Sequence, residues 1–462
     1  MMAALAASSL SLATAGPVFG QEAESTAAKP LFLSAKQVIV RPGQVLENAS
    51  VIVVDGKITA VGTDLTAPEG AELIEGEVVC AAFMDPWSTA GIDPISVRTD
   101  DVNAASLAVD ALDPFGQESV LQELTAAGVL LTRTQLGRTA DFSGIGAVIR
   151  TRTAEVVLPN AAISAAIGAE RRAVNVFAGG GFGPRTIDPL ERLGQIDKLG
   201  SELEAGAKYA DTLAKYEKEL AEWKTAIEKK EKELKDDFKK AKKARDKAVE
   251  KAKEDGKEVK EKKYKEDKRP RAPRFDAEKA VFADVVQGKM PLVVHAERAL
   301  EIRDLLRITE AHPRVRLVIA GGTSALACRD TLAERGVTVI VAPSPAKPGG
   351  PVGELDPGLA LAAELDAAGV NVLIGSGGSS ALASRELPLL AALAVGHGLS
   401  RDAALRAITS GPARVFDVAD QVGTVQRGQS ADLLVLSGDP LASSSRILAA
   451  ISGGVVAPTT NR

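Results

Sequence analysis

The chain has 462 residues, of which 45% are hydrophobic, and this length accommodates a barrel of about 250 residues with further elements added. The formal net charge of −5 excludes the strongly basic balance with which proteins bind nucleic acid or an anionic membrane surface. Two cysteines, Cys80 and Cys328, are too few for a disulfide-stabilised scaffold, and we expect both to be free, buried thiols.

The first twenty residues are typical of a secretory signal peptide. They are small and apolar, and residues 18–20 precede a polar stretch, as at a cleavage site. We therefore expect an exported, periplasmic protein. No later stretch has the roughly 20 uninterrupted apolar residues that a membrane helix requires, so we expect no membrane span in the mature chain.

Two segments far apart in the sequence have the pattern of β-strands. Residues 30–80 contain short alternating runs, and Asp55-Gly56 between two of them is a hairpin signal. Residues 413–445 contain similar runs. These segments predict one small composite β-domain built from both ends of the chain.

The middle of the chain, residues 81–412, alternates apolar runs with helical patterns. Several runs are apolar at consecutive positions, as strands buried on both faces are. The runs cover residues 78–84, 128–132, 144–149, 291–294, 316–320, 337–342 and 370–374. Strand–helix alternation predicts a parallel α/β fold, and about eight such units favour a (β/α)8, TIM-like barrel.

Residues 201–268 interrupt this alternation with a highly charged insert. Apolar residues recur there at intervals of four and three from Tyr209 to Ile227, which is a coiled-coil-like spacing. We expect a long helix or helical hairpin over 203–253 that projects from the barrel and uses this stripe for its contacts. A run of mixed charge is typical of a solvated helix face, but the stripe also suits a protein partner or a second copy of the chain.

Five stretches match the motifs of one known family, namely residues 76–89, 291–298, 317–323, 371–377 and 404–432. The last is the most specific. Together they resemble the metal-dependent amidohydrolase superfamily, especially its exported, imidazolonepropionase-like branch. The resemblance implies a barrel beside a small β-domain, and hydrolysis of non-peptide or cyclic amide C–N bonds.

The resemblance also implies a zinc-type metal held by a His-x-His pair on the first barrel strand, His on the fifth and sixth strands, and Asp on the eighth. Here Trp87 and Thr89 stand at the first two positions, Gly321 at the sixth strand and Gly377 at the eighth. The chain contains three histidines, and only His295 falls on a ligand position. We therefore expect no metal cofactor, because such ions need three or more ligands.

Several residues remain candidates for chemistry or ligand binding. His295 is either an acid–base group or a hydrogen-bonded remnant, and Asp85 either acts directly or supports the first strand. Trp87 either stacks on a ligand or fills the space of a lost metal and imidazole; Thr89 lies beside it. The Gly-rich strand ends with Thr323, and with Ser376 and Ser379, are candidate anion sites, since backbone N–H groups at a helix start attract carboxylate or phosphate.

Three functions follow from these features. The first is a catalytically impaired amidohydrolase-like protein of the cell envelope that acts as a binding or partner subunit. The second is an active hydrolase with a metal-free or rearranged site. The third is an assembly module that acts through the charged insert.

Overall fold

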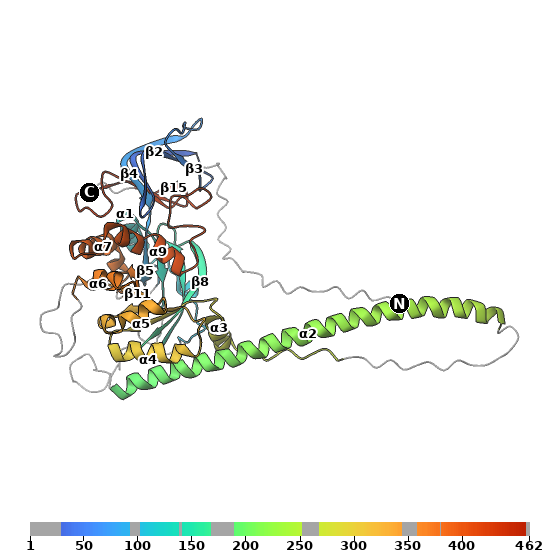
Figure 1. The fold of residues 1–462 in the computed structure, drawn as a ribbon. Helices are drawn as coiled ribbons and strands as arrows, with labels where there is room; N and C mark the ends of the chain where they lie inside the picture. The colour runs from blue at the N-terminus through green and yellow to red at the C-terminus, as the bar shows by residue number, and fades with distance from the viewer. Residues whose placement is uncertain are drawn as a thin grey trace.

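The structure is a computed structural model that describes residues 29–92, 102–137, 141–167, 189–251, 268–343, 358–378 and 380–458 (Figure 1). The expected signal segment, residues 1–20, lies outside these ranges. Within them, no helix is long and apolar enough to cross a membrane. Cys80 and Cys328 are free and buried, which confirms the prediction for both thiols.

A seven-stranded sheet joins the two ends of the chain, which confirms the composite β-domain. Its order is β15-β14-β13-β4-β1-β2-β3. Strand β4 is the junction, since it pairs parallel to β1 and antiparallel to β13. The strands are β1 (Leu31–Arg41), β2 (Gln44–Val54), β3 (Lys57–Gly62), β4 (Glu72–Ala81), β13 (Leu433–Leu436), β14 (Ile447–Ser452) and β15 (Val455–Val456).

Two details of this sheet concern the sequence predictions. The Asp55-Gly56 turn joins β2 to β3, and both residues have positive φ, 50° and 75°, as a type I′ hairpin requires. The C-terminal part differs from the predicted 413–445, because Ala413 lies in helix α9 (Ser410–Val415) and the sheet continues to Val456.

A second sheet of eight strands forms the barrel, in the order β12 to β5, and its two edge strands also contact each other. This confirms the TIM-like barrel. The strands are β5 (Phe83–Ser88), β6 (Val129–Thr134), β7 (Phe142–Arg150), β8 (Val156–Ala166), β9 (Leu292–Ala296), β10 (Leu317–Gly321), β11 (Thr338–Val341) and β12 (Asn371–Ile374).

The barrel departs from the expected parallel pattern at β7, which runs antiparallel to both β6 and β8. No helical pattern separates these three strands, so they form a meander, because antiparallel neighbours need only short connections. The sequence prediction missed β8, whose run is interrupted by Pro159 and Asn160.

Each strand contributes apolar side chains to the barrel interior, including Met84, Leu131, Val148, Ala162, Val293, Val318, Ile340 and Leu373. The opposite faces of the strands pack against helices in a larger core. The helices are α1 (Glu118–Ala126), α3 (Ala277–Val286), α4 (Ala299–Glu310), α5 (Arg329–Glu334), α6 (Leu361–Ala367), α7 (Leu387–Gly396), α8 (Arg401–Ala407) and α9, with short 3-10 helices at Ala108–Ala111, Ala325–Cys328 and Ala381–Glu386.

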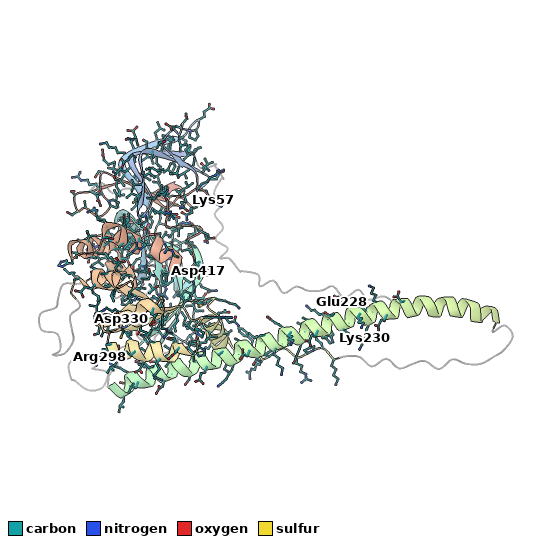
Figure 2. All side chains as sticks on the ribbon, in the orientation of Figure 1. Lys57, Glu228, Lys230, Arg298, Asp330 and Asp417 are labelled. Carbon is teal, nitrogen blue, oxygen red and sulfur yellow. The ribbon has the colours of Figure 1, made fainter. Side chains whose placement is uncertain are left out.

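Helix α2 (Pro189–Lys251) is the charged insert, and it extends far beyond the body of the protein (Figure 1). Its 63 residues span roughly 95 Å. Figure 2 shows Glu228 and Lys230 on the projecting part. The structure confirms a long helix, as a single helix over the described residues of the insert.

The base of α2 lies against α3 and α4, where Ile196, Leu199, Leu203 and Ala210 are buried. The prediction was therefore wrong about where the helix begins, and it missed the buried side chains that dock its base. A proline favours the first turn of a helix, and Pro189 starts α2 well before residue 203. The predicted contact stripe beyond Ala210 is only half-buried.

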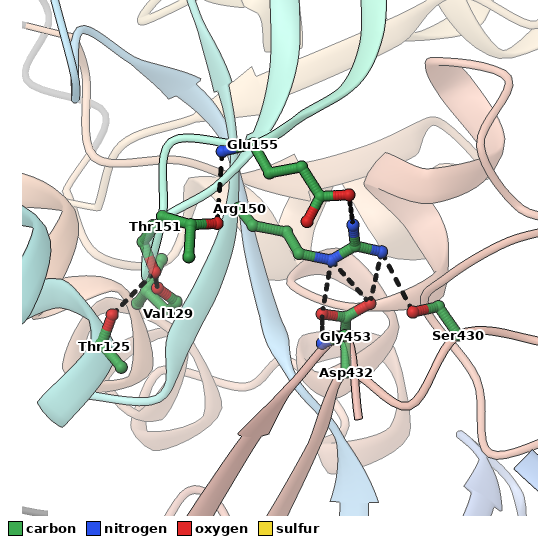
Figure 3. A network of polar contacts seen from close by, with 9 residues as sticks. Thr125, Val129, Arg150, Thr151, Glu155, Ser430, Asp432 and Gly453 are labelled. Carbon is green, nitrogen blue, oxygen red and sulfur yellow. Dashed lines mark hydrogen bonds and ion pairs between the residues drawn. The ribbon is translucent and has the colours of Figure 1, made fainter. Parts of the chain in front are cut away.

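A buried ion pair joins the barrel to the composite β-domain (Figure 3). Arg150 at the end of β7 donates to Asp432, which lies just before β13, with 3.0 Å between Nε and Oδ1. The same guanidinium also contacts Glu155 at 2.7 Å and the Ser430 hydroxyl at 3.0 Å. Burial lowers the pKa of Arg150, but the carboxylates of Asp432 and Glu155 outweigh this effect and raise it overall.

Candidate functional site

Asp85 lies in the middle of strand β5, and its buried carboxylate ties the first barrel strand to the loop after β12. Its Oδ1 accepts hydrogen bonds from the backbone N–H of Trp87, at 2.9 Å, and of Ser376, at 3.2 Å. Burial raises the pKa of Asp85, and the hydroxyls of Ser376 and Ser384 oppose that shift only in part. Asp85 thus holds the strand end in place from within the protein.

A group of hydroxyls surrounds this carboxylate. Ser376 donates to the Trp87 carbonyl at 3.0 Å, and its oxygen lies 3.3 Å from that of Ser384. Ser384 in turn lies 2.7 Å from Ser88. Sequence reasoning did not identify Ser384, because it lies in a short 3-10 helix and matches no motif.

Trp87 is nearly fully buried and belongs to the apolar cluster of the barrel interior. Its ring centroid lies 5.5 Å from that of His295. A Cβ atom added at Gly378 would lie 2.7 Å from the indole nitrogen, so no larger residue fits there beside the indole. The structure therefore places Trp87 where it fills space next to His295. Thr89 is half-buried beyond the strand end, and its carbonyl accepts from Ile92 at 3.2 Å.

His295, at the end of β9, pairs with Glu297, which sequence reasoning missed. Nε2 of His295 lies 3.0 Å from Oε1 of Glu297, and both side chains are partly exposed. The backbone N–H of Thr323 donates to Glu297 Oε2 at 3.1 Å. Burial raises the pKa of Glu297, but the contacts with His295 and Thr323 outweigh it and lower the pKa overall. The signal in the sequence was the spacing of two residues, which places both side chains on one side of an extended segment.

The Glu297 carboxylate occupies the position of a missing side chain on β10. Gly321 has φ of +94°, and a Cβ atom there would overlap Glu297 Oε1. Gly377, at the eighth-strand ligand position, also has positive φ, +88°. A side chain at either position would strain the backbone, and at Gly321 it would also displace Glu297.

The two predicted anion sites bind carboxylates of the protein itself. The N–H of Thr323 binds Glu297, and the N–H of Ser376 binds Asp85. Ser379 lies outside the described residues. Each of these two N–H groups therefore has an internal carboxylate partner, and ligand binding at Thr323 and Ser376 stays a prediction.

The described side chains do not fit the metal that the resemblance implies. Across the described ranges, no group of three or more His, Cys, Asp or Glu side chains is placed to hold a metal ion. At the mouth, His295 and Glu297 offer two donors, and Asp85 is fully buried beneath them in hydrogen bonds to the backbone. Zinc sites use three or four protein ligands.

Comparisons with known proteins agree with this architecture. The sequence model described as the amidohydrolase family matches residues 143–458. No curated protein sequence matches the chain. Among solved structures, an amidohydrolase from Thermotoga maritima MSB8 has a TM-score of 0.64 at 22% identity, covering 92% of this chain and 99% of its own.

Two further structures are similar at the level of the fold. A prolidase complexed with N-methylphosphonate-L-proline has a TM-score of 0.52 at 16% identity, covering 93% of this chain and 99% of its own. The ochratoxinase of A. niger has a TM-score of 0.52 at 14% identity, covering 93% and 96%.

Proposed function

Because the chain belongs to the amidohydrolase family, we propose that it is an amidohydrolase-like protein that has lost metal-dependent hydrolysis. Its ancestral activity would be cleavage of non-peptide or cyclic amide C–N bonds, as in the imidazolonepropionase-like branch that its motifs resemble. The barrel would then act as a binding or partner subunit in the cell envelope. The single observation that carries this proposal is the Glu297 carboxylate, which fills the side-chain position of Gly321.

Two further features of the barrel mouth support the loss of metal. Trp87 occupies the volume between the first and eighth strands, against Gly378. Asp85 is fully buried, and its Oδ1 accepts from two backbone N–H groups that would both lose their partner if the side chain turned, whereas its Oδ2 has no hydrogen-bond partner among the described residues. An unpaired buried N–H costs about 1–3 kcal/mol.

Chelation tests this proposal at the level of stability and activity together. We expect a strong chelator to leave the melting temperature unchanged, because no structural or catalytic ion contributes to folding. We also expect no chelator-sensitive hydrolysis of cyclic amides or N-acyl amino acids. A fall in melting temperature together with loss of a measurable hydrolase activity would show that the barrel carries a working metal centre.

A second candidate function is metal-free acid–base catalysis, which the His295–Glu297 pair favours. A carboxylate at 3.0 Å can orient an imidazole and stabilise its protonated form, and both side chains are partly exposed at the barrel mouth. This candidate predicts a hydrolase activity that survives chelation and is lost in His295→Asn. His312→Asn is a suitable control, because His312 follows α4, at the other end of that helix from His295.

We also propose that the mature protein is exported and that the 201–268 insert binds a protein partner or a second copy. The half-buried stripe beyond Ala210 supports this second role, since it lies on the projecting part of α2.

Light scattering of the purified full chain tests self-association. Leu220→Lys in the stripe should weaken it, and Lys218→Glu on the exposed face is the control. A mature N-terminus after Gly20 in mass spectra of the cell envelope fraction tests export.

A further inference from the structure

A chain of polar contacts runs from the base of α2 to the barrel mouth. Arg192, in the first turn of α2, contacts Glu301 of α4, with 2.6 Å between Nη1 and Oε1. The Glu301 side chain is only 5% exposed, so this ion pair is shielded from solvent. One oxygen of Glu301 thus faces the long helix.

The other oxygen of Glu301 holds the segment that carries Glu297. Oε2 accepts hydrogen bonds from the backbone N–H of Glu297 and of Arg298, both at 3.0 Å. Glu301 is the third residue of α4, where a carboxylate commonly caps the helix start. A hydrogen bond between charged partners is shorter and stronger than one between neutral groups, so the Arg192 contact holds the Glu301 side chain in place.

We propose that Arg192 and Glu301 are positioning residues, through which helix α2 fixes Glu297 against His295 and Thr323. This inference rests on the same site as the proposed function, but it does not depend on the absence of metal. The projecting helix and the barrel mouth are then mechanically joined, because the first turn of α2 and the Glu297 segment share one carboxylate. Loss of the contact between α2 and Glu301 should therefore loosen the segment that carries Glu297.

A second ion pair between α2 and the body provides a matched control. Lys198 lies two turns further along α2 and contacts Asp141 at 3.1 Å, with 50% of its side chain exposed. Asp141 also accepts from Gln195 at 3.1 Å. None of these described contacts reaches the segment from Glu297 to Glu301. Loss of this pair should therefore loosen the base of α2 without disturbing the mouth.

Hydrogen–deuterium exchange of the full chain tests the proposal, with peptides that cover 295–301 and 321–325. Arg192→Gln should speed exchange of the Glu297, Arg298 and Thr323 amides on the order of tenfold, because Glu301 loses the charged partner that holds its carboxylate against the first two amides. Arg192→Lys should restore part of the protection, and Lys198→Gln should leave both peptides as in the wild type.

Two results would overturn the proposal. One is unchanged exchange in both peptides in Arg192→Gln while the base of α2 exchanges faster. The other is an equal increase in Arg192→Gln and Lys198→Gln, which would indicate general loosening. If Arg192→Gln fails to fold, Glu301→Gln replaces it, since the amide keeps an acceptor oxygen but loses the charge. Metal content measured on the same samples separates this inference from the proposed function.

Discussion

The Glu297 carboxylate lies directly against Gly321: a Cβ atom built on Gly321 would come within 2.4 Å of Glu297 Oε1. In the family pattern that the sequence resembles, the sixth-strand position carries a histidine that binds metal. Here its place is taken by an acid that bonds to His295 and to the backbone of the next loop. Under the proposed function, this network within the protein stands where the family pattern would place a metal.

The close approach of Glu297 to Gly321 predicts that alanine destabilises the protein more at Gly321 than at a glycine with open space around it. Gly321→Ala meets both a left-handed backbone and the Glu297 carboxylate, whereas Gly336 has φ of +62° with open space around it. We expect Gly336→Ala to cost about 1 kcal/mol of unfolding free energy, and Gly321→Ala about 2–3 kcal/mol. In a Glu297→Ala background the part of this excess that comes from the carboxylate should be lost, while the backbone strain at φ +94° should remain. Chemical denaturation of the four variants measures this coupling, and simple additivity would refute it.

The pKa of Glu297 should respond to removal of its histidine partner. It is lowered in the folded protein, because His295 and Thr323 favour the ionised form more than burial disfavours it. His295→Asn should therefore raise the pKa of Glu297, as followed by carbon-13 NMR of its carboxyl group, while His312→Asn should not.

The sign of the pH effect on stability follows from this shift. A carboxyl with a lowered folded pKa stabilises the protein above its unfolded pKa, and the contribution is lost as pH falls through the folded value. His295→Asn should weaken this acid-side dependence. A steeper loss of stability at acid pH in the variant would contradict the assignment of the pair.

Asp85 should behave in the opposite way, since burial raises its pKa. Such a group stabilises the fold below its unfolded pKa, and this contribution is lost as pH rises through the folded value. Asp85→Asn keeps an oxygen for the Trp87 and Ser376 N–H groups but cannot ionise. The variant should therefore not lose this stability as the pH rises. Asp85→Ala leaves both donors unpaired and should cost about 2–4 kcal/mol. Equal stability of the two variants would exclude this bracing role.

The Arg150–Asp432 ion pair should be a main attachment between barrel and β-domain (Figure 3). The Asp432 side chain is fully buried, so Asp432→Asn leaves the guanidinium with the exposed Glu155 as its remaining charged partner and should cost about 3 kcal/mol. Glu155 is the second partner of this guanidinium, and its side chain is 60% exposed. Glu155→Gln should therefore cost no more than about 1 kcal/mol. Thermal unfolding compares them, and equal losses would show that Asp432 is not the anchor.

The sequence was informative where the residue pattern reflects the barrel itself. Consecutive apolar runs located β9 to β12, and the Asp55-Gly56 turn located a hairpin, because both patterns depend on local geometry. The meander at β7 was not visible, since strand direction depends on which connections carry helices. The contacts of Glu297 with Thr323 and of Ser384 with Ser88 join segments that are distant in sequence, so no local pattern indicates them.

The attachment of α2 to the body was also not predictable from local sequence. Heptad spacing identified the helix, yet its docking side chains lie earlier, from Ile196 to Ala210. That region also carries Arg192, whose partner Glu301 is 109 positions away in sequence. Local periodicity therefore predicted the element but not its attachment.

Elemental analysis of the purified, untagged full chain is the most direct test of the central claim that the barrel mouth holds no metal. The protein should be produced in medium supplemented with zinc, manganese and iron, and dialysed without chelator. We predict transition-metal content well below one ion per chain, with no change in His295→Asn. One tightly held ion per chain that is lost in His295→Asn and retained in His312→Asn would contradict the account.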